Sequence, residues 1–312
     1  MGFKVLITDG LEKEGIDIIN ATGEAVNKKG IEPDELLQII GEYDGLIVRG
    51  RTKVTREVFE AAKNLKVVGR AGVGVDNIDL QAAKDHGVTV VNAPVATTIA
   101  VAELGFGMML ALVRDIPHTD AEMKHDKWTK KDYKGHELHG KTLGIVGYGN
   151  IGSTIGKYAQ ALGMKVLCYD PIRNIDEMRA TGADPVQLED IYAKSDIITF
   201  HVPLIPETKH MVNDETFTKM KDGVLLVNVA RGGIIEEAAL LRALESGKVA
   251  GAALDVYEKE PPVDWTIAEH PKVIAVPHVG GQTEEAQLRV AGDIASEVMN
   301  VLQGNKVRWK IC

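Results

Sequence analysis

Three side chains of different chemistry follow apolar runs in the last third of the chain. Arg231 lies in the segment Asn-Val-Ala-Arg-Gly-Gly, Glu260 precedes two prolines, and His278 follows Pro277. A histidine can exchange a proton with a substrate hydroxyl near neutral pH, and a neighbouring carboxylate orients its ring and favours the protonated form. A guanidinium binds a carboxylate through paired hydrogen bonds. Together these groups suit hydride transfer between a hydroxy acid and its keto acid.

Each of these residues alone is more often structural. An arginine often pairs with a surface acid, a glutamate before Pro-Pro often caps a turn, and a lone histidine is usually a loop residue. Here each follows a predicted strand, and the carboxyl ends of parallel strands meet at one edge of a sheet, where ligands bind. We therefore predict that the three lie together. The strands are expected at Val224–Val227, Ala250–Leu254 and Val273–Val276.

A glycine-rich turn supplies the cofactor side of this chemistry. The apolar run Leu143–Val146 leads into Gly147-x-Gly149-x-x-Gly152, followed by a helical segment and a second strand that ends at Asp170. Gly147 permits a tight turn, Gly149 lets backbone amides approach a pyrophosphate, and Gly152 allows close packing of helix on strand. The helix N-terminus attracts phosphate, and the acid accepts hydrogen bonds from a ribose. A flexible surface turn would leave Asp170 unexplained, so we predict a dinucleotide site.

Other chemistries are disfavoured by the same sequence. Asp170 would repel a 2′-phosphate, so NAD is preferred to NADP although Arg173 lies three residues further on. His136-Glu-Leu-His139 lacks the spacing of a zinc motif, and no metal site is predicted. No Gly-x-Ser-x-Gly segment is present, which argues against a serine hydrolase.

Composition indicates which partners to expect. The 312 residues carry a net charge of −9, which argues against nucleic acid or an anionic membrane as the main partner. The apolar run Val101–Val113 contains Glu103 and is too short to span a bilayer. The chain begins with a predicted strand in place of a signal peptide, and its two cysteines, Cys168 and Cys312, form no disulfide framework. A cytoplasmic protein is expected.

Strands and helices alternate along the whole chain, which predicts an α/β fold with two doubly wound parallel-sheet domains. Residues 1–97 with 283–312 would form a substrate-binding domain, and residues 98–282 a Rossmann NAD-binding domain. A long helix from Thr98 to about Asp120 would cross between them. The final helix is expected at Glu284–Gln303, where apolar residues recur every four positions.

Positive charge is concentrated in the first domain of this acidic chain. Arg49 and Arg70 each follow a predicted strand, whereas Arg51 and Lys53 share a loop and could equally be solvated. A carboxylate needs one guanidinium, which Arg231 already supplies, so the surplus cations indicate a second anion on the substrate, such as a phosphate.

The chain resembles the D-isomer-specific 2-hydroxyacid dehydrogenases over essentially its whole length. The likeness is carried by the segments 70–79, 147–152 with Asp170, 201–208, 228–232, 255–262 and 277–283. Within this family the short-type phosphoglycerate dehydrogenases are the most similar branch, on residues 46–55, 70–79 and 128–135. Because the chain ends soon after the last helix, the regulatory extension of longer members is expected to be missing.

The resemblance implies a role for each matching residue. His278 would be the acid/base, Glu260 its partner, and Arg231 the clamp of the substrate carboxylate. NAD would be bound by Gly147, Gly149, Asn150, Ile151, Gly152, Asp170, Val73, Val202, Thr208, Val229, Ala230, Asp255, Gly280 and Gly281. Substrate would be held by Arg49, Arg70, Val73 and Gly74 together with Arg231 and His278. The chain departs from the family pattern at Gly50, Thr97 and Ala100.

The implied activity is NAD-dependent oxidation of a D-2-hydroxy acid to the 2-keto acid, with 3-phosphoglycerate, a precursor in serine biosynthesis, as the first candidate. A glyoxylate or hydroxypyruvate reductase is the alternative, and a non-catalytic NAD-sensing regulator is the alternative from another class. A homodimer is expected, because the lysine-rich segment around Trp128 could pack across a subunit boundary.

Overall fold

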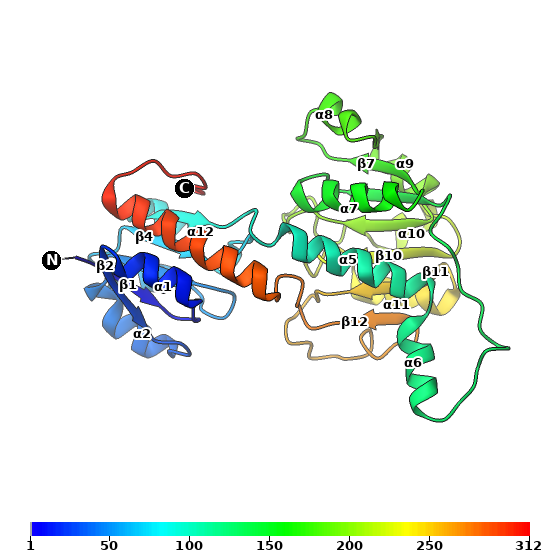
Figure 1. Cartoon of the computed structure of the whole chain (residues 1–312), viewed down its shortest axis with the longest axis horizontal. Coiled ribbons are helices and arrows are strands. Elements are labelled where there is room, and N and C mark those ends of the chain that lie inside the picture. The colour runs from blue at the N-terminus through cyan, green and yellow to red at the C-terminus, as the bar shows by residue number, and fades with distance from the viewer. Residues whose placement is uncertain (1) are drawn as a thin grey trace. The chain divides into compact units, whose positions relative to one another are not determined.

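The computed structural model describes residues 2–312 and divides into two compact units (Figure 1). Unit 1 comprises the chain up to Thr97 together with Gly281–Cys312, and unit 2 comprises Thr98–Gly280. Each unit has its own parallel sheet with helices on both faces, so the predicted fold class of two parallel α/β domains is confirmed.

Unit 1 is built on a five-stranded parallel sheet with the strand order β2-β1-β3-β4-β5. Its strands are β1 (Phe3–Ile7), β2 (Gly23–Asn27), β3 (Gly45–Val48), β4 (Val67–Arg70) and β5 (Thr89–Asn92). Its helices are α1 (Lys13–Asn20), α2 (Pro33–Ile39), the 3-10 turn η1 (Ile40–Glu42), α3 (Arg56–Ala61), α4 (Leu80–Asp85) and α12 (Glu284–Gln303). All four residues of β3 are buried, as expected of a parallel strand covered on both faces.

Helix α12 has the bounds that the sequence predicts. Thr283 caps it by accepting the Ala286 N–H (3.1 Å), and Gly304 ends it in the left-handed conformation, with φ 73°. The residues spaced four apart are all buried and pack against α1 and the sheet: Ala286, Val290, Ile294, Val298 and Leu302. The period of the apolar residues thus determined both the type of this element and its buried face.

Unit 2 has a seven-stranded parallel sheet with the order β12-β11-β10-β9-β6-β7-β8. Its strands are β6 (Thr142–Val146), β7 (Lys165–Tyr169), β8 (Asp184–Pro185), β9 (Ile197–Phe200), β10 (Val224–Asn228), β11 (Val249–Leu254) and β12 (Val273–Ala275). Its helices are α5 (Thr98–Val113), α6 (Ile116–Lys124), α7 (Asn150–Ala161), α8 (Ile175–Ala180), α9 (Leu188–Lys194), α10 (Asp214–Lys219) and α11 (Glu237–Ser246). The order reverses between β6 and β9, which is the switch point where doubly wound sheets bind nucleotides.

The prediction of one long helix from Thr98 to about Asp120 is wrong. The helix ends at Val113, and α6 begins at Ile116 after Asp115, whose φ of 47° lies in the left-handed region. Pro117 explains the break, because it has no N–H to bond the carbonyl of Val113 and its ring would clash with that carbonyl, whereas proline is tolerated in the first turn of α6.

The two helices at this break differ in burial. Helix α5 is apolar and buries half of its residues, whereas α6 buries none. Within residues 2–312, no helix has both the length and the apolar character needed to cross a membrane.

Candidate active site

The three predicted catalytic residues converge in unit 2. They follow the adjacent strands β10, β11 and β12 at the carboxyl edge of the sheet. His278 Nδ1 lies 2.6 Å from Glu260 Oε2, and the side chains are 47% and 36% exposed. Burial alone would raise the pKa of Glu260, but the hydrogen bond from His278 and the positive charges of His278 and Arg231 hold it below its usual value. Glu260 is therefore a carboxylate at neutral pH.

This carboxylate decides which nitrogen of His278 faces a substrate. A carboxylate only accepts hydrogen bonds, so Nδ1 must carry the proton in the contact with Glu260. The Nε2 atom is left to act as the acid or base, which is the arrangement that proton exchange with a hydroxyl requires.

The backbone at His278 is strained and held from several sides. Its φ of 52° is left-handed, which costs a non-glycine residue about 1–2 kcal/mol. The His278 N–H donates to Asp255 O (2.9 Å), and the Asp255 carboxylate accepts the N–H groups of Val279 (2.6 Å) and Gly280 (2.9 Å). Burial raises the pKa of Asp255 in spite of these two bonds. Asp255 thus fixes the loop that carries the histidine.

Arg231 is placed by the last residue of β10. Asn228 Oδ1 accepts the Ala230 N–H (3.2 Å), and its Nδ2 donates to Arg231 O (2.9 Å). The guanidinium Nη1 bonds Ala230 O at 2.6 Å. Buried Val229, which contacts α5 near Gly105, completes this short turn.

The glycine turn has the geometry that a pyrophosphate site needs. Gly147 has a φ of 89°, and a Cβ on it would lie 2.6 Å from His201 O. A Cβ on Gly152 would lie 2.2 Å from Gly147 O, whereas a Cβ on Gly149 would meet no atom within 4 Å. Gly149 precedes α7, and Asn150 and Ile151 open the helix, so their N–H groups have no acceptor within the helix. These residues fit the pyrophosphate of a dinucleotide.

Asp170, at the end of β7, ties this turn to the next loop. Its Oδ2 accepts the Tyr148 N–H (2.9 Å), and its Oδ1 accepts those of Ile172 (2.9 Å) and Arg173 (3.1 Å). A carboxylate has about four acceptor positions, so one is left for a ribose hydroxyl. Arg173 is committed to Tyr148 O through Nη1, at 2.7 Å. That bond holds the arginine on the protein backbone.

His201 lies beside the glycine turn and was not predicted as a site residue. Its Nε2 bonds Thr199 Oγ1 at 2.9 Å, while its Nδ1 is buried without a hydrogen-bond partner among residues 2–312. Burial lowers the pKa of His201 to about 3, so the ring is neutral near pH 7. The available signal was its position directly after a strand. Nearby Val202 is half-buried, and Thr208 Oγ1 accepts the Ile205 N–H (2.9 Å) in the same loop.

The remaining predicted residues belong to unit 1. Arg49 and Arg70 end or follow β3 and β4, and Val73 is held by the Asn92 amide, which donates to Val73 O at 2.6 Å. Gly74 continues the same loop. Gly281 accepts a hydrogen bond from Gln287 Nε2 (2.6 Å) on α12.

Arg49 differs from its neighbour Arg51. The Nε and Nη2 atoms of Arg49 are buried and have no hydrogen-bond partner in the described part of the chain. Burial lowers the pKa of Arg49 against the charges of Glu12 and Asp9, which raise it. Arg51 instead pairs with Asp9 (3.2 Å) and donates to the Ile31 carbonyl (2.9 Å), so it stabilises the loop.

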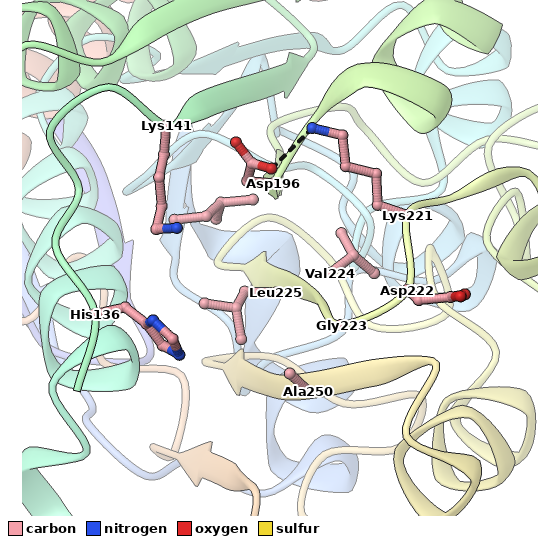
Figure 2. A pocket seen from close by; sticks show the side chains of 10 residues that line it. His136, Lys141, Asp196, Lys221, Asp222, Gly223, Val224, Leu225 and Ala250 are labelled. Atoms are coloured by element: carbon pink, nitrogen blue, oxygen red, sulfur yellow. Dashed lines mark hydrogen bonds and ion pairs between the residues drawn. The ribbon is translucent and has the colours of Figure 1, made fainter. Parts of the chain in front are cut away.

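A separate cavity of about 240 Å³ lies at the opposite, amino edge of the sheet in unit 2 (Figure 2). Its acids are paired, Asp196 with Lys221 and Asp222 with Lys248, both at 2.8 Å. None of the predicted site residues lines it. The lining residues are His136, Lys141, Asp196, Ile197, Lys221, Asp222, Gly223, Val224, Leu225 and Ala250. These ion pairs stabilise the starts of the strands. The predicted catalytic residues lie at the other edge of the sheet.

We searched the described residues for a group of side chains that could bind a metal ion. Across residues 2–312, no three His, Cys, Asp or Glu side chains are grouped so that they could hold a metal ion.

Comparison with known proteins agrees with the geometry. Residues 106–280 match the family model described as "D-isomer specific 2-hydroxyacid dehydrogenase, NAD binding domain". The chain is 47% identical over 303 residues to D-3-phosphoglycerate dehydrogenase 2, chloroplastic, of Arabidopsis thaliana, covering 96% of this chain and 49% of the relative. It is 47% identical over 304 residues to D-3-phosphoglycerate dehydrogenase of Bacillus subtilis, covering 97% and 57%. The chain therefore spans about half the length of the curated relatives it matches.

Solved structures show the same architecture. A glyoxylate reductase from Paecilomyes thermophila superposes with a TM-score of 0.92 at 28% identity, covering 99% of this chain and 98% of the other. D-lactate dehydrogenase from Aquifex aeolicus, complexed with NAD and lactic acid, gives a TM-score of 0.86 at 29% identity, covering 96% of each chain. The cofactor predicted from the glycine turn, NAD, is thereby confirmed.

Proposed function

Because the chain belongs to the D-isomer-specific 2-hydroxyacid dehydrogenase family, we propose that it oxidises a D-2-hydroxy acid to the 2-keto acid with NAD. The observation that carries this proposal is the 2.6 Å contact between His278 and Glu260, with Arg231 on the neighbouring strand. All three lie at the sheet edge that bears the glycine turn.

The residues divide the chemistry among them. Arg231 binds the substrate carboxylate and orients the hydroxyl-bearing carbon. His278 Nε2 accepts the hydroxyl proton during oxidation and returns it during reduction, while Glu260 stabilises the imidazolium. Bound NAD supplies the hydride acceptor. NAD would be held by the glycine turn, by Asp170 and by the other residues that the family resemblance assigns to the cofactor.

D-3-phosphoglycerate is the substrate that we propose first. Curated relatives with 44–47% identity over most of this chain carry the name D-3-phosphoglycerate dehydrogenase. The buried Nε and Nη2 atoms of Arg49 support a second anion, since an unsatisfied buried donor costs about 1–3 kcal/mol and a phosphate would satisfy it. Arg70, Val73 and Gly74 would contribute to the same substrate contacts. Serine biosynthesis in the cytoplasm would be the setting.

The substrate assignment is tested by comparing phosphorylated and unphosphorylated hydroxy acids. Wild-type kcat/KM for D-3-phosphoglycerate should exceed that for D-glycerate by at least about tenfold, or about 1.4 kcal/mol. Arg49→Ala should remove most of this ratio, whereas Lys63→Ala, at an exposed cation of the same unit, should keep it. If wild type uses glycerate equally well, the assignment is wrong and a glyoxylate or hydroxypyruvate reductase takes its place.

A homodimer is the assembly that we propose, with residues 114–140 of unit 2 as the contact arm. Helix α6 and the segment after it project from the body of this unit (Figure 1). The arm exposes three large apolar side chains, Ile116 (51%), Met123 (54%) and Trp128 (76%). Burying these exposed apolar side chains of the arm against a second copy of the chain would be favourable.

A further inference from the structure

Glu260 lies on a loop that is held by residues outside the proposed chemistry. The loop follows β11, and within it the Tyr257 N–H donates to Glu260 Oε1 at 3.1 Å. The Tyr257 hydroxyl donates to Val276 O (3.2 Å), just before the His278 loop. The next residue, Glu258, connects this loop to a different element.

Glu258 and Glu237 exchange hydrogen bonds between side chain and backbone. The Glu258 N–H donates to Glu237 Oε1 (2.7 Å), and the Glu237 N–H donates to Glu258 Oε1 (2.9 Å). Glu237 is the first residue of α11, so its N–H has no partner within the helix. The Glu258 carboxylate therefore caps this helix from another loop, where the helix dipole favours negative charge.

The same contact lies next to the loop that carries Arg231. A Cβ on Gly232 would lie only 1.7 Å from Tyr257 O, so the backbones of the two loops touch. His210 Nε2 lies 3.3 Å from Glu258 Oε1, and the His210 N–H bonds Gly233 O at 2.7 Å. The Glu237–Glu258 exchange thus joins the loops of Arg231 and Glu260 to one helix.

Holding these two carboxylates together has an electrostatic cost. Burial raises the pKa of Glu237, and the negative charge of Glu258 raises it further, against the hydrogen bond from the Glu258 N–H. Two carboxylates held together repel, and arrangements of this kind concentrate at functional sites.

We infer that Glu237 is a positioning residue, which fixes the Glu258 amide and thereby the orientation of Glu260 toward His278. This inference rests on the proposed function. Glu237 itself touches neither substrate nor cofactor and acts only through the loop.

Three variants test the inference. Glu237→Ala removes the acceptor, Glu237→Gln keeps an acceptor oxygen without the charge, and Lys259→Ala is the control at an exposed position of the same loop. Glu237→Ala should lower kcat by about tenfold or more with KM for NAD unchanged, because small misplacements of catalytic groups are costly. Glu237→Gln and Lys259→Ala should stay close to wild type. If Glu237→Ala does not fold, Glu237→Asp takes its place, because the shorter side chain withdraws the acceptor from the Glu258 N–H and keeps the charge.

A readout without turnover separates this inference from the proposed function. The His278 ring is followed by NMR through a pH titration, with His278→Ala to assign the signal. In Glu237→Ala the titration should move to lower pH, in the direction produced by Glu260→Gln, since the carboxylate no longer faces the ring. An unchanged titration and kcat would overturn the positioning role, as would an equal loss in Glu237→Gln. Absence of turnover in wild type with an intact titration shift would instead count against the proposed function.

Discussion

At the scale of single residues, the site depends on one short contact and on how its members are held. The sequence predicts that Arg231, Glu260 and His278 meet, because each follows a strand of one parallel sheet. It could not predict the left-handed backbone of His278 or the two bonds by which Asp255 secures it, since both arise from packing between loops. His201 was missed for a related reason. Only the folded chain buries its ring, and that burial keeps the ring neutral well below pH 7.

Glu260→Gln tests the charge of the pair. The depressed pKa of Glu260 means that its carboxylate survives as the pH falls, until the pH passes that lowered value. Above this value the negative charge favours the protonated form of His278, which reduction of a keto acid needs. The variant loses that charge, so the limb of the kcat/KM profile where reduction fails at high pH should move to lower pH.

The profile should be measured for wild type and Glu260→Gln in the direction of keto-acid reduction. Glu258→Gln serves as the control, because it keeps an acceptor for the α11 amide and leaves the His278 contact intact. A limb that stays in place in Glu260→Gln would argue against the dyad.

At the scale of elements, alternation of apolar runs predicts most of the strands, whereas short or half-exposed elements escape it. Strand β2 has no fully buried residue and β8 has only two residues, so neither carries a readable pattern. The break between α5 and α6 was missed although Pro117 signals it, because the apolar run before it is strongly helical. The glycine turn could be predicted from its spacing, and the structure agrees: a Cβ would clash with backbone at Gly147 and at Gly152, while the space beside Gly149 is open.

Gly152→Ala tests the close packing in this turn. The new Cβ would lie 2.2 Å from Gly147 O, which is backbone and cannot rotate away. Unfolding free energy should fall by roughly 1–3 kcal/mol, and NAD affinity should fall because the turn is displaced.

Gly107→Ala is the matched control, since it is also a helical glycine of unit 2 but has no atom within 4 Å of the new Cβ. It should leave stability unchanged or raise it by about 0.5–1 kcal/mol, as alanine is the better helix former. Denaturant unfolding and NADH titration measure both variants. Equal stability of the two would show that the turn tolerates a side chain.

At the scale of the whole molecule, the sequence predicts the fold class and the family better than the assembly or the substrate. The fold class and the family follow from local periodicity and a few motifs. The two parallel sheets confirm the fold class, and the family match confirms the family. Assembly depends on which surface residues contact a second copy, and the periodicity of apolar residues along the chain does not identify them. Substrate choice depends on the net effect of several cations, of which Arg51 proves to be structural.

Trp128→Ala tests the proposed dimer. The side chain is 76% exposed, and a buried tryptophan at an interface is worth about 2 kcal/mol or more, so the dimer Kd should rise by about 30-fold. Trp265→Ala is the control, because Trp265 is 54% exposed but lies outside the arm. Sedimentation measures both. A monomeric wild type, or an equal loss in Trp265→Ala, would contradict the arm as the contact.

The central claim is that this chain transfers a hydride by proton exchange at His278. The most direct measurement is turnover of NAD with D-3-phosphoglycerate by wild type and His278→Ala, with NADH binding followed in parallel. Wild type should form NADH, and His278→Ala should lose roughly 10²–10⁴-fold in kcat with NADH affinity little changed. Near-normal turnover in the variant would contradict the role of His278. NADH binding by wild type without turnover of any hydroxy acid would contradict the dehydrogenase itself and favour an NAD-sensing regulator.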